Sequence, residues 1–214
     1  MPATSIAGLA SIPERVRAFI ALRLDAAVEA AIAALVERLR APQNDIRQND
    51  IPEDGIRWVR RANFHLTLFF LGPAVPRERL ASISEALGAI AEATPPFEIV
   101  ARGVGVFPNP VRPRVIWVGL DGDELAALAA RVAEAAARCG FAPERRPYSP
   151  HLTIGRVRSL NSPGRLRRAL SEVADSNFGV SRIERVIVYR SELGPQSSTY
   201  HELAAFPLGP RERG

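Results

Sequence analysis

Lysine is absent from the 214-residue chain. All 28 basic residues are therefore arginines, and against 23 acidic residues they give a net charge of +5. A guanidinium group binds phosphate through two parallel hydrogen bonds. The excess of positive charge therefore permits a nucleic acid partner. An alanine- and arginine-rich chain is also what a GC-rich genome tends to encode. Charge alone therefore does not require such a partner.

Cysteine is almost absent as well, because Cys139 is the only one. A single thiol excludes an intramolecular disulfide and a cysteine-rich metal site. The chain has no apolar run near the ~18 residues of a membrane helix, and no basic segment leading into a secretory signal. It also lacks a GxxxxGK[ST] loop and a GxGxxG turn. We expect a soluble cytoplasmic monomer with no membrane association.

The hydrophobic pattern predicts two halves with the same order of elements: strand, helix, strand, helix, strand. Strands are expected at residues 16–22, 64–71, 97–107, 114–120, 151–157, 182–193 and 200–208. Helices are expected after Asp25, around 80–90, from Asp123 and after Pro163, and a polar loop is expected at 41–55.

This order predicts an α+β fold of two pseudo-symmetric lobes, each a mostly antiparallel sheet covered by helices on one face. A central cleft between the lobes is the natural place for a site. We expect a single domain over residues 15–208, with lobes formed mainly by 15–107 and 114–208. Residues 1–14 read as a loose leader.

The second strand of each half opens with matching letters, HLTL at His65 and HLTI at His151. Successive side chains in a strand point to opposite faces, so the aliphatic residues of each motif are predicted to face inward. His65 and Thr67 then share the other face, as do His151 and Thr153. Each lobe therefore offers one imidazole and one hydroxyl on an open face.

Two histidines that face each other across a cleft form an acid–base pair, because one neutral ring accepts a proton while a charged ring donates one. Threonine hydroxyls beside them can donate hydrogen bonds to phosphate oxygens. A single His-x-Thr motif is a weak signal, and its repetition at matched positions carries the hypothesis. The third histidine, His201, matches nothing and is predicted to lie on the surface or at a sheet edge.

A metal site is the competing use of two histidines. Metal hydrolases usually add carboxylates at close spacing. The neighbours of the two histidines are instead Phe64, Leu66, Pro150 and Leu152. We therefore expect chemistry without a metal or another cofactor.

The segments HLTLFFLG, from His65, and RPYSPHLTIGR, from Arg146, resemble the paired HxTx motifs of the two-histidine phosphoesterases. Within that superfamily the chain resembles the LigT-like RNA 2',3'-cyclic phosphodiesterases, also called 2'-5' RNA ligases, of bacteria and archaea. The similarity runs from about Arg15 to Leu208. It includes the segments RAFIAL, RWVRRANFHLTLFFLG, FPNPVRPRVIWVGL and VIVYRSELGPQSSTYHEL.

The resemblance implies hydrolysis of a terminal 2',3'-cyclic phosphate to a 2'-phosphate, and a reversible 2'-5' ligation. RNA 3' ends or small nucleotides with a 2',3'-cyclic phosphate are the implied partners. By position, His65 is the implied proton donor to the leaving 3'-oxygen, and His151 is the implied acceptor that activates water. Thr67 and Thr153 are the implied phosphate-binding residues.

Arg156 and Tyr148 are the implied substrate-binding residues that flank the second motif. Plain alternation turns Arg156 away from Thr153, so a bulge or the strand end must redirect it if it binds substrate. Tyr148 either stacks on a base or packs at the cleft wall. Arg60 and Arg61 stand where many relatives carry proline, which either extends an RNA-binding rim or reflects composition.

Two other functions stay open at the level of the sequence. One is an RNA-end-binding module without turnover, and the other is a phosphodiesterase for another small 2'-linked nucleotide. Substrate length depends on the loops at 41–56, 107–113 and 193–199, whose conformations the sequence does not fix.

Overall fold

The computed structural model describes residues 12–40, 55–144, 146–159, 163–194 and 198–210. Its helices are α1 (Ala26–Arg40), α2 (Arg77–Glu92), α3 (Asp123–Arg138) and α4 (Pro163–Glu172), with a short 3-10 helix η2 (Arg61–Asn63). Its strands are β1 (Arg15–Leu22), β2 (Ile56–Trp58), β3 (Leu66–Pro76), β4 (Phe97–Phe107), β5 (Val115–Asp121), β6 (His151–Val157), β7 (Asn177–Ile183), β8 (Arg185–Leu193) and β9 (Ser198–Pro207). Most of the predicted leader at 1–14 and of the predicted loop at 41–55 lies outside the described residues.

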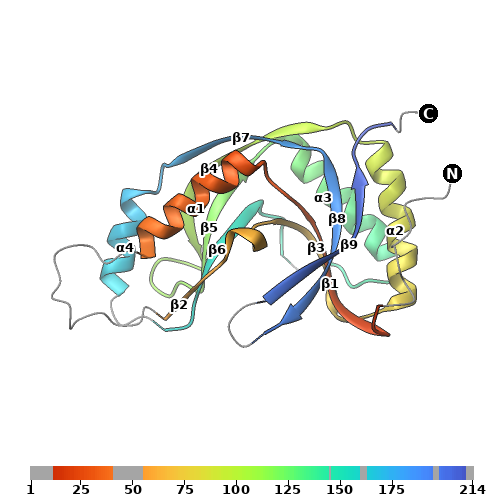
Figure 1. The fold of residues 1–214 in the computed structure, drawn as a ribbon, viewed down its shortest axis with the longest axis horizontal. Helices are drawn as coiled ribbons and strands as arrows, with labels where there is room; N and C mark the ends of the chain where they lie inside the picture. The colour runs from red at the N-terminus through yellow and green to blue at the C-terminus, as the bar shows by residue number, and fades with distance from the viewer. Residues whose placement is uncertain (1–11, 41–54, 145, 160–162, 195–197, 211–214) are drawn as a thin grey trace.

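The strands form one continuous sheet in the order β7–β4–β5–β6–β3–β1–β8–β9, with β2 added beside β6 (Figure 1). The pairings are antiparallel. Strands β3 and β6 are paired at Leu66 and Leu152, and this pair joins the two halves of the sheet. The predicted α+β class with mostly antiparallel strands is confirmed.

The halves of the sheet take strands from both halves of the chain. Strand β4 lies between β5 and β7, whereas β8 and β9 continue the sheet beyond β1. The repeat had led us to expect sequential lobes of 15–107 and 114–208. The order of elements does repeat, with β1-α1-β3-α2-β4 matching β5-α3-β6-α4-β7. Local periodicity reveals that order, but it does not reveal which strands pair.

Two predicted strands differ most from the observed ones. The segment 182–193 is not one strand, because it breaks at Glu184 into β7 and β8, which lie far apart in the sheet order. Two consecutive exposed residues, Glu184 and Arg185, mark the break. Strand β3 continues past Gly72 to Pro76, because Gly72 adopts a φ of +142° at an irregularity in the pairing with β1.

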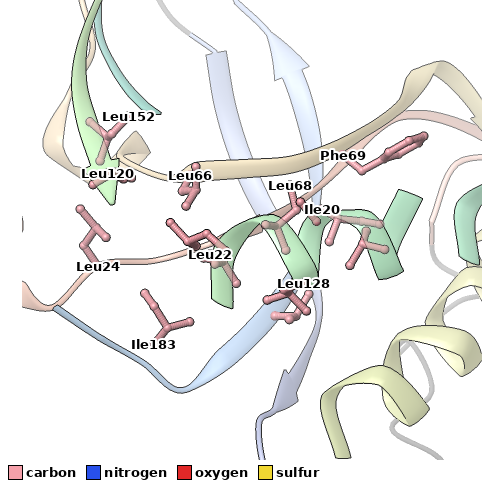
Figure 2. Close-up of a cluster of buried hydrophobic side chains, with 14 of the residues drawn as sticks. Ile20, Leu22, Leu24, Leu66, Leu68, Phe69, Leu120, Leu128, Leu152 and Ile183 are labelled. Carbon is pink, nitrogen blue, oxygen red and sulfur yellow. The ribbon is translucent and has the colours of Figure 1, made fainter. Parts of the chain in front are cut away.

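The main core fills the space between the helices and one face of the sheet. Alternate residues of β1, such as Ile20 and Leu22, and of β3, such as Leu66, are buried in it together with Leu128 of α3 (Figure 2). Residues of α1, α2 and α4 also pack in this cluster. The opposite face of the sheet is free of this cluster, and it carries the polar residues of the two motifs.

Candidate active site

The two motifs lie at the start of neighbouring strands, since His65 immediately precedes β3 and His151 is the first residue of β6. The aliphatic residues of both motifs are buried in the main core, while the histidines and threonines are only partly buried. This is the alternation that the sequence predicts. We call the surface formed by His65, Thr67, His151 and Thr153 the histidine face.

The pairing of Leu66 with Leu152 arranges these four residues around one point of the sheet. When this antiparallel register is extended by one residue each way, His65 faces Thr153 and Thr67 faces His151. In a regular pair, opposite Cβ atoms are about 5 Å apart and diagonal neighbours about 7–8 Å apart. The two histidines are diagonal neighbours, so one small group can touch both rings.

Both imidazole rings are anchored in the same way. Nδ1 of His65 lies 2.8 Å from the carbonyl oxygen of Asn63, and Nδ1 of His151 lies 2.7 Å from that of Ser149. Because a carbonyl oxygen only accepts hydrogen bonds, each Nδ1 carries the hydrogen and donates it. In the neutral ring, Nε2 then holds the free lone pair. Each ring therefore offers Nε2 for proton transfer.

Aromatic side chains from other strands surround both rings. The His65 ring lies 4.8 Å from the Phe19 ring and 5.1 Å from the Tyr200 ring, centroid to centroid. The His151 ring meets the Phe107 ring edge-on at 5.1 Å. These contacts limit the rotation of the imidazoles. The sequence analysis missed the three aromatic residues, because they reach the site through the long-range pairing of β1, β9 and β4.

Burial lowers the pKa of His65 from its ordinary value of 6.5 to about 4, despite the opposing effect of the hydrogen bond to the Asn63 carbonyl. The positive charges of Arg23 and Arg156 lower this pKa further, and so does a proton on His151. His65 is therefore neutral at pH 7 in the free protein. The influence of Arg156 and His151 on His65 also agrees with their place on one face of the sheet.

Arg23 is a further site residue that was not predicted from the sequence. Its Nε donates a hydrogen bond of 2.8 Å to Glu29, which is buried, and its Nη1 donates one of 3.1 Å to the carbonyl oxygen of Ala62. The residue follows Ala21 by two positions, so alternation along β1 directs it to the histidine face. The alternation along β1 can be read from the sequence. Only the pairing of β1 with β3 shows that this face of β1 adjoins His65.

Acid is expected to destabilise the fold through His65. Between pH 6.5 and about 4 the unfolded chain binds a proton at this ring that the folded chain does not, so the free energy of unfolding falls as the pH falls. At about 1.4 kcal/mol per pH unit, the full loss approaches about 3 kcal/mol. Urea unfolding at about pH 7 and about pH 4.5 measures this loss, and His65→Gln should show a weaker pH dependence. Equal pH dependence in both proteins would contradict the low pKa.

A bulge in β6 redirects Arg156. Along strand β5, Val115 pairs with Arg156 and Trp117 pairs with Thr153. Three residues of β5 therefore lie opposite four of β6, and Ile154 is the extra residue. Val115 and Trp117 point to the same side of β5, and opposite residues share a face. Arg156 therefore lies on the histidine face, and its side chain is exposed. The irregularity that substrate binding by Arg156 requires is present.

The other residues singled out around the motifs have structural contacts. Tyr148 packs against the main core, and its hydroxyl oxygen is shielded from solvent with no hydrogen-bond partner in the described part of the chain. Burial raises the pKa of this hydroxyl. The packing alternative is therefore favoured over base stacking. Arg61 donates a hydrogen bond of 2.7 Å to the Ala26 carbonyl oxygen and so ties η2 to α1, whereas Arg60 is exposed.

His201 lies on β9, the strand at the end of the sheet order, as predicted, and on this strand it is Tyr200 that contacts the His65 ring. Its Nε2 is 3.1 Å from Glu192 on β8, and it is exposed. Across residues 12–210, apart from the undescribed gaps, no three histidine, cysteine, aspartate or glutamate residues group as metal ligands would.

The sequence matches a known family over most of its length, because the family model described as the 2'-5' RNA ligase superfamily covers residues 27–192. The chain belongs to the 2'-5' RNA ligase superfamily. Several curated relatives carry the name RNA 2',3'-cyclic phosphodiesterase, two of which follow. The one from Methanothermobacter thermautotrophicus is 32% identical over 91% of this chain and 100% of its own length. The one from Aeropyrum pernix is 33% identical over 82% of this chain and 99% of its own length.

Solved structures share the fold of this superfamily member. Escherichia coli LigT complexed with 3'-AMP has a TM-score of 0.69 at 26% identity, covering 91% of this chain and 99% of LigT. A protein from Thermus thermophilus has a TM-score of 0.70 at 28% identity, covering 92% of this chain and all of that protein. None of the described helices is both long and apolar enough to span a membrane.

Proposed function

We propose that this chain is an RNA 2',3'-cyclic phosphodiesterase that opens a terminal cyclic phosphate to a 2'-phosphate with His65 and His151 as its acid–base pair. The main support is that two histidines with the same Nδ1 anchor stand diagonally across β3 and β6 on one face. The second support is that relatives matching 91% and 82% of the chain carry this name. One chain supplies both histidines, so a monomer suffices. A cytoplasmic setting, where RNA ends are abundant, fits the single cysteine.

In the proposed reaction, Nε2 of His151 accepts a proton from water while the water oxygen attacks phosphorus. The bond between phosphorus and the 3'-oxygen breaks, and His65 donates a proton to that oxygen. The product carries a 2'-phosphate and a free 3'-hydroxyl. The hydroxyls of Thr67 and Thr153 donate hydrogen bonds to the non-bridging oxygens, where negative charge develops.

The proposed donor must be protonated when the 3'-oxygen leaves, but the pKa of His65 is about 4 in the free protein. A bound cyclic phosphate carries a negative charge next to the ring, and an opposite charge within ~4–6 Å favours the protonated imidazole. Substrate binding is therefore expected to raise the pKa of His65 and to draw a proton onto it. The enzyme would thus gain its acid only when the substrate is present.

The same atoms support a 2'-5' ligation if the 5'-hydroxyl of a second RNA replaces water. His151 then accepts the proton of that hydroxyl, the new phosphorus–oxygen bond forms at the 2'-phosphate, and the 3'-oxygen leaves with a proton from His65. The reverse reaction uses the same two rings with exchanged roles. Hydrolysis is favoured because water is far more concentrated than any RNA end.

The product of a synthetic RNA ending in a 2',3'-cyclic phosphate tests the proposal. We expect phosphorus NMR to show a 2'-phosphate, at an unchanged rate after dialysis against EDTA. A 3'-phosphate product, or activity that EDTA removes and a metal restores, would contradict the two-histidine mechanism. Tight binding of the RNA without opening would instead identify an RNA-end-binding module. Faster opening of small 2'-linked nucleotides would identify the other alternative.

A further inference from the structure

Arg57 stands directly opposite Arg156 where β2 pairs with β6. Opposite residues of an antiparallel pair share a face, and their Cβ atoms are about 5 Å apart. Because Arg156 lies on the histidine face, Arg57 lies there too. The next pair, Trp58 opposite Gly155, holds this register from the other face, because Trp58 packs on Gly155 and against the main core.

Among the described residues, neither guanidinium group has a counter-charge. Nη2 of Arg57 is shielded from solvent and has no hydrogen-bond partner among the described residues. In the same part of the chain, neither arginine takes part in an ion pair. Like charges directly opposite each other weaken a sheet, and a shielded charged donor without an acceptor is costly. An anion bound between them would remove both costs.

The chemistry of the pair fits a phosphodiester. Two neighbouring guanidinium forks offer several N–H donors, and phosphate oxygens accept them in pairs. Arg156 is exposed and Arg57 only partly buried, so the pair opens to solvent on one side. No bound metal or prosthetic group is needed to complete such a site.

The position of Arg57 and Arg156 in the sheet indicates which phosphate of the substrate they bind. Along β5, the partner of Arg156 lies two residues from the partner of Thr153, which in a strand is about 6.7 Å. The pair therefore lies one step beyond the threonine that is proposed to hold the cyclic phosphate. We propose that Arg57 and Arg156 together bind the phosphodiester that precedes the terminal cyclic phosphate of an RNA strand.

This inference rests on the proposed function for the identity of the ligand, and it adds a substrate preference. A cyclic mononucleotide has no preceding phosphodiester, so it gains nothing from the pair. An RNA strand gains charge-assisted hydrogen bonds at a second phosphate. The enzyme is therefore selective for RNA ends over 2',3'-cyclic mononucleotides.

The test compares 2',3'-cyclic AMP with a trinucleotide that ends in a 2',3'-cyclic phosphate. For Arg57→Met, kcat/KM on the trinucleotide is expected to fall about tenfold or more, while kcat/KM on the mononucleotide changes less than about twofold. Arg57→Lys keeps the charge but loses the fork, so it should restore part of the loss. Arg182→Met, which removes the same charge from β7, should change neither value.

Binding of a trinucleotide with a plain 3'-phosphate, measured by fluorescence anisotropy, repeats the comparison without turnover. Its Kd is expected to rise about tenfold in Arg57→Met. An equal fall in kcat/KM on both cyclic substrates in Arg57→Met would overturn the inference, as would an unchanged kcat/KM on the trinucleotide. If the native protein opens neither cyclic substrate but Arg57→Met still raises the Kd of the trinucleotide, the proposed reaction is wrong and the phosphate site is retained.

Discussion

Replacing His151 with alanine is expected to lower kcat for cyclic phosphate opening by about a hundredfold or more, and His65→Ala is expected to do the same. Each variant removes one Nε2 that takes part in proton transfer, while the carbonyl groups that anchor the rings remain. Because the two rings act in one step, the double variant should be little slower than either single variant. Steady-state rates on a cyclic-ended RNA measure all three.

His201→Ala is the matched control for these variants. It removes the third imidazole, which contacts Glu192 at the end of the sheet, and it should leave kcat unchanged. A His151→Ala enzyme of near-normal rate would eliminate the acid–base pair. Comparable losses in His201→Ala would show that the effect is not specific to the histidine face.

A substrate with a p-nitrophenyl leaving group separates the two roles. Its leaving oxygen departs without a proton, so the variant that lacks the donor loses less on this substrate than the variant that lacks the acceptor. With His65 as donor, His65→Ala should therefore be the faster of the two. The opposite order would exchange the assigned roles.

Alternation along single strands was enough to predict which residues of the two motifs face away from the core. Side chains alternate strictly, so HLTL and HLTI each fix one polar and one apolar face without any knowledge of neighbours. The bounds of β4 and β6 were predicted to the residue for the same reason. Buried aliphatic positions at helical spacing likewise predicted α3, whose Leu125, Leu128 and Val132 are buried.

Pairing between strands distant in the sequence was not predictable, and much of the site depends on it. Phe19 and Arg23 reach His65 because β1 pairs with β3. Phe107 reaches His151 because β4 crosses to the half of the sheet that holds β6. The bulge that redirects Arg156, and the strand that brings Arg57 opposite it, arise from the same pairings. A local pattern shows which face of a strand is buried, but it does not identify which distant strand is its partner.

Leu152→Ala is expected to lower the free energy of unfolding by about 2–5 kcal/mol, the range for a buried leucine truncated to alanine. Leu152 is 0% exposed and pairs with Leu66 at the point where the two halves of the sheet meet. Its loss leaves a cavity directly beneath the residues of the histidine face. We therefore also expect kcat to fall in the variant while it is still folded, and urea unfolding with steady-state rates measures both effects.

Leu193→Ala makes the same substitution at an exposed position, where the side chain is 73% exposed at the end of β8. It should change the free energy of unfolding by less than about 0.5 kcal/mol and leave kcat alone. If Leu152→Ala lowered the free energy of unfolding but left kcat unchanged, the pairing of Leu66 with Leu152 would support the fold without setting the spacing of the histidines. A joint loss would tie the acid–base geometry to this junction, because no other described pairing connects β3 directly to β6.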